Sequence, residues 1–348
     1  MINYEAIAPM NFSKGDIRRA GELLKRTELR NTAEYRQAVQ LVQTWRGYYF
    51  YPLNTLQAHV RNQLKHIGQE PYIGQRLKRL PTIIDKLSRI KGTLETMQDI
   101  GGMRVLCDDV ASMDALMHLL EKSRARHKIK RTSDYITTPK QDGYRGKHFI
   151  YEVYSSSSKT PDFLQGMTVE LQVRTSIQHD WATAVEVVDM VYHSSLKTGS
   201  GSDEWKQFFL LASAMGAHLE GLPRPAPYEH STTEELRQCF FENNAISDCF
   251  LKLDAIQLIE PTTLHDRYYH VLATDYDQLH SCVSFADKEE ATKAYNMFES
   301  MSPESGAMHV VLVEADGKKL AKMYKNYFHN VNNFVEMIDA FLFKHAHE

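Results

Sequence analysis

The chain has 348 residues, a formal net charge of −3 and four cysteines. Its length allows two domains, each with a core of its own, and its weak negative charge excludes chain-wide attraction to nucleic acid, so that such binding needs a local basic patch. The scattered cysteines form no CxxC pair and indicate neither a disulfide framework nor a zinc site. Because no leader pattern and no apolar run of membrane-spanning length occur, we expect a cytoplasmic protein without membrane contact.

Helical patterns dominate the first seventy residues. Ser13 followed by Asp16 is the pattern of a capping box at the start of an amphipathic helix. Residues 32–64 predict two more helices, separated at Pro52.

A basic segment comes next. We interpret residues 76–89 as helical, and positions 79 and 86 are seven apart, so that several cations can share one face and grip a polyphosphate. The cations of this segment are Arg76, Lys78, Arg79, Lys86 and Arg89. Asp99 then stands just before a predicted strand at 100–107, which contains Arg104.

A second basic stretch follows a predicted helix at 111–121. Its six cations alternate as they would along a strand, and they are Lys122, Arg124, Arg126, Lys128, Lys130 and Arg131. A charged edge strand that resists aggregation has this pattern. A contact with the phosphate backbone of RNA has it too, and both interpretations stay open.

The most informative segment is residues 139–186. It holds a glycine-tyrosine loop, GYRGKH, at 143–148 and a strand that places Glu170, Gln172 and Arg174 on one face at a period of two. A strand with a solvated polar face would look the same. Asp99 and Glu170 among cations, however, are what is needed to hold Mg²⁺ against phosphates and to take a proton from an attacking hydroxyl.

The character of the chain changes after residue 221. Three prolines in residues 222–232 predict a linker, and residues 233–348 are long enough for a second, smaller α+β domain. Its expected elements are a helix at 233–244, strands at 248–259, 267–273 and 280–285, a helix at 287–300, a strand at 308–315, and helices at 317–325 and 331–344. Tyr324 and Tyr327 lie three apart, as neighbours on a helical turn or as ordinary packing residues.

Five blocks of the sequence together resemble the synthetase domain of the RelA/SpoT group, enzymes that move the pyrophosphate of ATP onto a nucleotide 3′-hydroxyl. The blocks are RLKRLPTIIDKL, DIGGMRVL, GYRGKH, VELQVRTSIQHDWA and the later Glu186. The resemblance covers roughly residues 20–220 and implies an α+β fold for residues 1–221, with a mixed β-sheet flanked by helices. No Walker-type loop is present, so side-chain cations would bind the phosphates.

The resemblance also implies a role for each matching residue. Asp99 and Glu170 would be the Mg²⁺ ligands, and Glu170 the base for the acceptor hydroxyl, with Gln172 and Arg174 orienting the acceptor. The residues expected to hold ATP are Arg76, Lys78, Arg79, Lys86 and Arg104. Lys140, Tyr144 and His148 would bind the acceptor, with Tyr144 stacked on its base.

Two further stretches narrow the resemblance. The segment QTWRGYYFYPLN is similar to toxic small alarmone synthetases, a branch that includes members acting on tRNA. The segment KMYKNYFHNVNNF resembles the end of fused toxin–antitoxin proteins called CapRel. This likeness implies that residues 233–348 are a pseudo-zinc-finger-like antitoxin domain, in which Tyr324 or Tyr327 blocks the ATP site until a phage structural protein, such as a capsid protein, releases it.

The predicted function is pyrophosphate transfer from ATP to the 3′-hydroxyl of the tRNA CCA end by a monomer. Arg145 and Lys147 in the GYRGKH loop favour such a large anionic acceptor. Two alternatives stay open. One is a (p)ppGpp synthetase that uses GDP or GTP, and the other is an inactive module that only senses a nucleotide or a partner.

Overall fold

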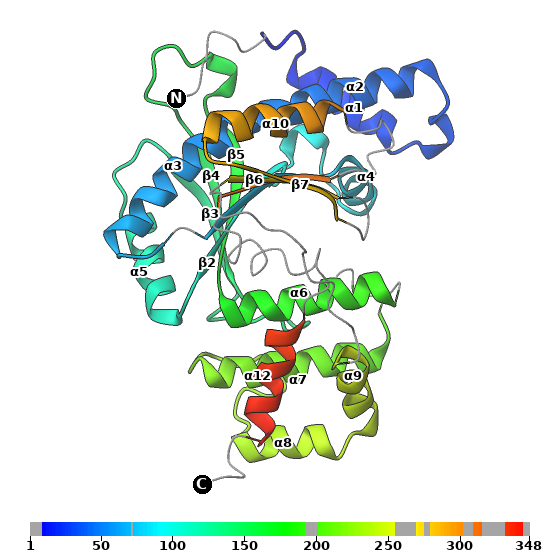
Figure 1. The fold of residues 1–348 in the computed structure, drawn as a ribbon. Helices are drawn as coiled ribbons and strands as arrows, with labels where there is room; N and C mark the ends of the chain where they lie inside the picture. Colours follow the sequence, from blue (N-terminus) through cyan, green and yellow to red (C-terminus); the bar gives the residue numbers. More distant parts are fainter. Residues whose placement is uncertain are drawn as a thin grey trace.

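Eight strands form one mixed sheet at the centre of the molecule, in the order β3-β4-β5-β2-β1-β8-β6-β7 (Figure 1). The structure is a computed structural model that describes residues 9–70, 72–192, 196, 199, 201–254, 269–274, 279–301, 309–314 and 331–343. The strands are β1 Ile73–Leu77, β2 Gly101–Cys107, β3 Lys128–Asp134, β4 Lys147–Val153, β5 Met167–Thr175, β6 Tyr269–Thr274, β7 Leu279–Phe285 and β8 His309–Glu314. Only the β2–β5 pair is parallel among the described strands, so the predicted mixed sheet flanked by helices is confirmed.

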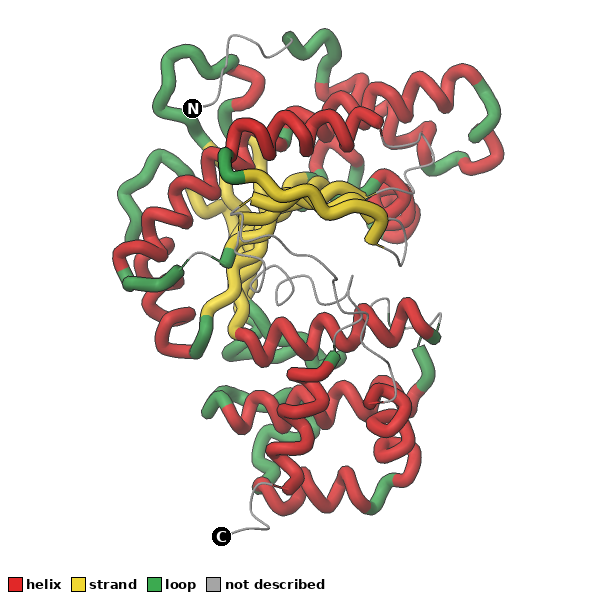
Figure 2. Tube along the Cα trace, viewed as in Figure 1, coloured by secondary structure: helices red, strands yellow, loops and turns green. Residues whose placement is uncertain are grey.

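The helices form two groups that pack around separate cores. One group covers a face of the sheet, and the other forms a bundle on the opposite side, as Figure 2 shows. The first group is α1 Lys14–Leu24, α2 Ala33–Tyr48, α3 Phe50–His66, α4 Leu80–Arg89, α5 Val110–Glu121 and α10 Lys288–Met301. The second is α6 Ser176–Val191, α7 Asp203–Leu219, α8 Thr233–Phe241, α9 Asn244–Asp254 and α12 Asn332–Phe343. No helix in the described part of the chain has the length and apolarity needed to cross a membrane.

The N-terminal helices agree with the sequence pattern. The predicted capping box is present at α1, where the Ser13 amide donates to Asp16 Oδ2 at 2.7 Å. The break between α2 and α3 falls at Tyr49, three residues before the predicted position. Pro52 lies in the first turn of α3, where a missing N–H leaves no helical hydrogen bond unmade.

The prediction of one helix through residues 76–89 is wrong. Arg76 belongs to β1, and α4 begins only at Leu80, after Arg79 as its N-cap. Pro81 fits this start, since its fixed φ suits the first turn of a helix and its missing N–H leaves no helical hydrogen bond unmade there. Arg76 and Lys78 therefore cannot share a helical face with Lys86.

The prediction of one alternating basic strand over residues 122–131 is also wrong. Lys122 caps the C-terminus of α5, β3 begins only at Lys128, and a bulge between Ile129 and Arg131 interrupts the alternation. All six cations are nevertheless exposed. β3 is an edge strand of the sheet, and Lys130 pairs with Glu152 on β4 at 3.1 Å.

In the C-terminal part, most expected elements are found, with one exception. Helix α9 occupies residues predicted as the strand 248–259, as far as the chain is described there. Its buried residues Ile246, Cys249 and Leu253 are three and four apart, which is helical spacing. The predicted helix at 317–325 lies outside the described residues.

The N- and C-terminal segments share both the sheet and a core. β8 pairs with β1 in an antiparallel register that joins Ile73 to Glu314, and Phe334 of α12 stacks on Phe209 of α7 with ring centroids 5.9 Å apart. The limits 1–221, 222–232 and 233–348 remain a proposal. The described parts of the last segment are packed against the first.

Candidate nucleotide-binding site

A cavity of about 890 Å³ lies between the sheet and helices α6 and α7. Ten of the predicted site residues line it, namely Arg76, Lys78, Asp99, Arg104, Lys140, Tyr144, His148, Glu170, Gln172 and Arg174. They converge because β2 and β5 are parallel neighbours, with Gly102 opposite Glu170 and Arg104 opposite Gln172. The opposite wall is mostly apolar and comes from α6 and α7, with Trp181, Val185, Phe209 and Leu210.

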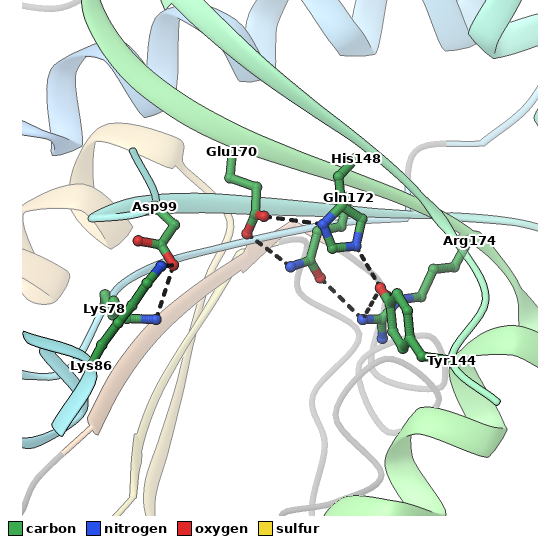
Figure 3. Close-up of polar contacts among 8 residues, drawn as sticks. All are labelled: Lys78, Lys86, Asp99, Tyr144, His148, Glu170, Gln172 and Arg174. Atoms are coloured by element: carbon green, nitrogen blue, oxygen red, sulfur yellow. Dashed lines mark hydrogen bonds and ion pairs between the residues drawn. The ribbon is translucent and has the colours of Figure 1, made fainter. Parts of the chain in front are cut away.

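One end of the site is a carboxylate between two lysines (Figure 3). Asp99 Oδ2 accepts from Lys78 Nζ at 3.1 Å and from Lys86 Nζ at 2.6 Å. The other oxygen, Asp99 Oδ1, is buried and accepts no hydrogen bond in the described structure. Burial lowers the pKa of Lys78, while the Asp99 charge opposes that shift. The cluster thus joins two lysines to a carboxylate that has one buried oxygen without a hydrogen bond.

The centre of the site is a closed ring of hydrogen bonds among five side chains, drawn in Figure 3. Glu170 Oε1 lies 3.1 Å from His148 Nδ1, and His148 Nε2 lies 2.6 Å from the Tyr144 hydroxyl. Arg174 Nη2 donates to that hydroxyl at 2.7 Å and to Gln172 Oε1 at 3.2 Å. Gln172 Nε2 closes the ring by donating to Glu170 Oε2 at 2.9 Å. The period-two interpretation of Glu170, Gln172 and Arg174 is therefore confirmed in geometry.

This ring determines the protonation state of Glu170. Burial acts to raise the pKa of Glu170, but the hydrogen bond and charge of His148, the Gln172 amide and the Lys78 charge together lower it to about 2. Burial raises the pKa of Tyr144, with the neighbouring Arg174 opposing the shift. At neutral pH the ring therefore contains a carboxylate and a neutral phenol.

The glycine-tyrosine loop is built tightly around Tyr144. Gly143 has φ of +89°, and a Cβ there would lie 3.0 Å from the Ser213 Cβ on α7, so the position requires glycine. Lys140 Nζ lies 5.0 Å from the centroid of the Tyr144 ring, and Arg174 Cζ lies 4.9 Å from it. The expected stacking of Tyr144 on an acceptor base remains a prediction.

Two cations of this loop do not face the site, contrary to the argument for a large anionic acceptor. Arg145 is 2% exposed, and its Nη1 lies 2.5 Å from Glu220 Oε2. Lys147 points to Glu121, with Nζ 2.7 Å from Oε1. Sequence position alone favoured contacts with a large anionic acceptor, but a buried carboxylate, Glu220, binds Arg145 and an exposed one, Glu121, binds Lys147.

The remaining predicted residues divide into three groups. Lys86 reaches the site through Asp99, and Arg79 is the N-cap of α4. The six cations of residues 122–131 do not line the cavity. Tyr324 and Tyr327 lie outside the described residues.

Sequence reasoning missed the apolar wall. Trp181, Val185 and Leu210 read as ordinary core residues of amphipathic helices, and only the packing of α6 and α7 opposite the sheet brings them to the cavity. Glu186, noted in the sequence blocks, also lines it.

The donor set fits a magnesium ion held together with phosphates. In the described part of the chain no three His, Cys, Asp or Glu side chains gather as a complete metal cage. Mg²⁺ does not need one, because it binds through one or two carboxylates, substrate phosphates and water. Asp99, with its unpaired buried oxygen, and the ionised Glu170 are the residues that would hold it.

Part of this chain is similar in sequence to known proteins. Residues 75–196 match the profile described as "Region found in RelA / SpoT proteins". Two relatives are the GTP pyrophosphokinases YwaC and YjbM of Bacillus subtilis. Each is 28% identical to this chain, over an alignment that covers 36% of it. The matched parts are 58% of YwaC and 59% of YjbM, so the chain spans less than two thirds of either relative.

Solved structures give a weaker likeness. The small alarmone synthetase 1 of Bacillus subtilis, bound to its product pppGpp, is 21% identical, with a TM-score of 0.43 over 52% of this chain and 94% of that one. A GTP pyrophosphokinase family protein of Streptococcus pneumoniae is 25% identical, with a TM-score of 0.41 over 50% and 86%. The profile match includes residues 75–77 of β1 and all of β2, β4 and β5, which carry most of the polar wall. Residues 75–196 are thus similar in sequence to the region found in RelA/SpoT proteins.

Proposed function

We propose that this protein transfers the pyrophosphate group of ATP to a hydroxyl group of a nucleotide acceptor. The observation that carries the proposal is the pairing, in one cavity, of the Asp99–Lys78–Lys86 cluster with the ring around Glu170. The first has the chemistry to bind a metal–triphosphate, and the second holds an anionic carboxylate beside hydrogen-bonding groups for a second substrate.

The reaction requires the acceptor oxygen to attack the β-phosphorus of ATP. The bond between that phosphorus and the oxygen bridging to the α-phosphate breaks, AMP leaves, and the hydroxyl proton is released. When bound, Mg²⁺ supplies charge neutralisation at the phosphates. Lys78 and Lys86 add positive charge at the Asp99 end of the site, and Arg76 and Arg104 add more along its sheet wall, which would orient the chain of phosphates.

Glu170 is ionised throughout the physiological range, as a base or a metal ligand must be. A pKa of about 2 makes it a weak base, since proton transfer is most efficient when the pKa lies near the working pH. We therefore assign it first to the metal and to the orientation of the acceptor through His148. Deprotonation of the hydroxyl is its second role.

Two acceptors are compatible with the site, and each has an observation in its favour. The printed names of YwaC and YjbM support a guanosine nucleotide. The exposed cations of β3 support the CCA end of tRNA. Arg131 is opposite Ile150 and Lys128 is opposite Glu152, two and four residues along β4 from His148. At about 3.4 Å per residue these positions lie roughly 7 and 14 Å along β4 from His148, where the backbone of a tRNA whose end occupies the cavity can reach them.

The test is incubation of the full chain with ATP labelled on its γ-phosphate, with GDP, GTP or deacylated tRNA in separate tubes. The full chain is needed because Phe334 and β8 belong to the core and the sheet. Label on GDP or GTP would establish a guanosine nucleotide pyrophosphokinase. Label on tRNA, lost on charge reversal of Lys128, Lys130 and Arg131, would establish the second acceptor.

Glu170→Gln and Asp99→Asn are the matched negative controls for the transfer. Labelled product that survives both changes would contradict the proposal and leave the inactive sensing module as the better interpretation. Glu289→Gln, in an exposed ion pair on α10, should leave the rate unchanged.

Regulation by the C-terminal part is also proposed, with Tyr324 or Tyr327 blocking the ATP site and a phage structural protein releasing it. The support is the placement of the flanking elements. β8 pairs with β1, which contributes Arg76 and other residues to one wall, and α12 packs on α6 and α7, which form the other. A Tyr324→Ala and Tyr327→Ala double variant should be more toxic to cells than the parent chain. Equal toxicity would remove this part of the proposal.

A further inference from the structure

A buried polar cluster behind the Tyr144 loop has no part in the chemistry proposed above. Arg145 is its centre, with Nη1 2.5 Å from Glu220 Oε2 and Nε donating to Ser213 Oγ at 3.2 Å. Ser213 in turn donates to the Gly143 carbonyl at 2.5 Å. Both members of the ion pair have side chains at most 5% exposed, so neither can reach a substrate.

Glu220 also connects two other elements of the site. Its Oε1 accepts from the hydroxyl of Thr175, which ends β5 and caps α6, and its Oε2 lies 3.4 Å from Gln178 Nε2. Glu220 itself is the C-cap of α7. One carboxylate therefore ties together the glycine-tyrosine loop, the end of the strand that carries Glu170, and the helix that forms the apolar wall.

Helix α7 is shaped to receive the arginine. A Cβ on Gly216 would lie 2.8 Å from Arg145 Nη2 and 2.9 Å from Ile177 Cγ2, so only glycine leaves room there. The loop is fixed on both sides of Tyr144, by Ser213 at Gly143 and by Glu220 at Arg145. The direction of the Tyr144 hydroxyl into the ring of Glu170 follows from these two attachments.

We infer that Arg145 and Glu220 are a positioning pair that acts through Tyr144 to set the acceptor half of the site. The inference rests on the proposed function and names the residues that position its acceptor. ATP binding should be unaffected, because Lys78 and Lys86 are held by Asp99, which is not a member of the cluster. Since misplacement of a bound group by about 1 Å can lower a rate about 10²-fold, loss of the pair should be visible in acceptor kinetics.

A buried ion pair can also serve stability alone, and the variants must separate the two roles. Glu220→Gln leaves Arg145 buried without a counter-charge and is expected to destabilise the fold. The double variant Arg145→Met with Glu220→Met removes both charges at similar volume, which proteins often tolerate. Glu289→Gln is the control, since it breaks an exposed pair on α10 of the same chemical type.

The experiment measures the thermal midpoint, the KM for ATP and for the acceptor, and amide hydrogen exchange of residues 139–148, all on the full chain. For the double variant we expect a midpoint near that of the parent, a KM for the acceptor at least about tenfold higher, an unchanged KM for ATP, and exchange of the loop at least about tenfold faster. A purely stabilising pair would instead lower the fraction of active protein and leave both KM values as they were.

The double variant with parental KM for the acceptor and parental loop exchange would overturn the inference. If the parent transfers label to no acceptor, the proposed function fails, and the exchange of residues 139–148 alone decides the positioning role. Faster exchange confined to that loop then supports it, and unchanged exchange refutes it.

Discussion

The ring around Glu170 predicts a pH-dependent contribution to stability that Glu170→Gln removes. The pKa of Glu170 is lowered from 4.5 to about 2 in the folded chain. At about 1.4 kcal/mol per unit, the shift is worth roughly 3 kcal/mol. Because the folded pKa is the lower one, this stabilisation is complete above the unfolded pKa and is lost as the pH falls from about 5 towards 2.

The assay is urea unfolding of parent and variant at several pH values. Between about pH 6 and pH 3 the parent should lose roughly 2 kcal/mol more of its free energy of unfolding than Glu170→Gln, which is the part of the shift already titrated at pH 3. Subtracting the variant's change in free energy of unfolding from that of the parent removes the contribution of the other carboxylates that titrate in the same range. A difference that stays constant with pH would refute the argument that His148 and Gln172 hold Glu170 ionised.

Three other changes test separate parts of the structure. Asp99→Asn should lower kcat about 10²-fold or more, because it removes the anion with the unpaired oxygen; a smaller loss in the label-transfer assay would argue against a metal there. Gly143→Ala should lower the melting temperature and raise the acceptor KM, since left-handed φ costs roughly 1–2 kcal/mol with a Cβ and that Cβ meets Ser213. Phe334→Ala should reduce the free energy of unfolding by about 3–5 kcal/mol, because the ring is 1% exposed; a loss below about 1 kcal/mol would mean that α12 is not part of the core.

The polar wall of the site was predictable because its signals are local. Period-two spacing along β5 put Glu170, Gln172 and Arg174 on one face, and a lone Asp99 before a strand marked the second carboxylate. Neither inference needed a long-range contact.

The predictions that were wrong depended on contacts between distant parts of the chain or on a single backbone irregularity. Arg145 suggested a large anionic acceptor because its partner, Glu220, is 75 positions away. The bulge at Lys130 broke an alternation that the sequence itself shows as regular. The pairing of β1 with β8 has no local signal, since sheet order follows from packing and not from spacing.

That pairing also concerns the newly made chain. β1 ends at Leu77 and its partner β8 ends at Glu314, so about 235 residues are synthesised between them. At a synthesis rate of about 5–20 residues per second, β8 follows β1 by roughly 12–50 s, and during this time one edge of β1 has no partner strand. Open strand edges pair with other chains. Synthesis that stops before β8 would therefore leave a fragment with an aggregation-prone edge at the site itself. The last part of the chain is thus needed to protect the first part from aggregation.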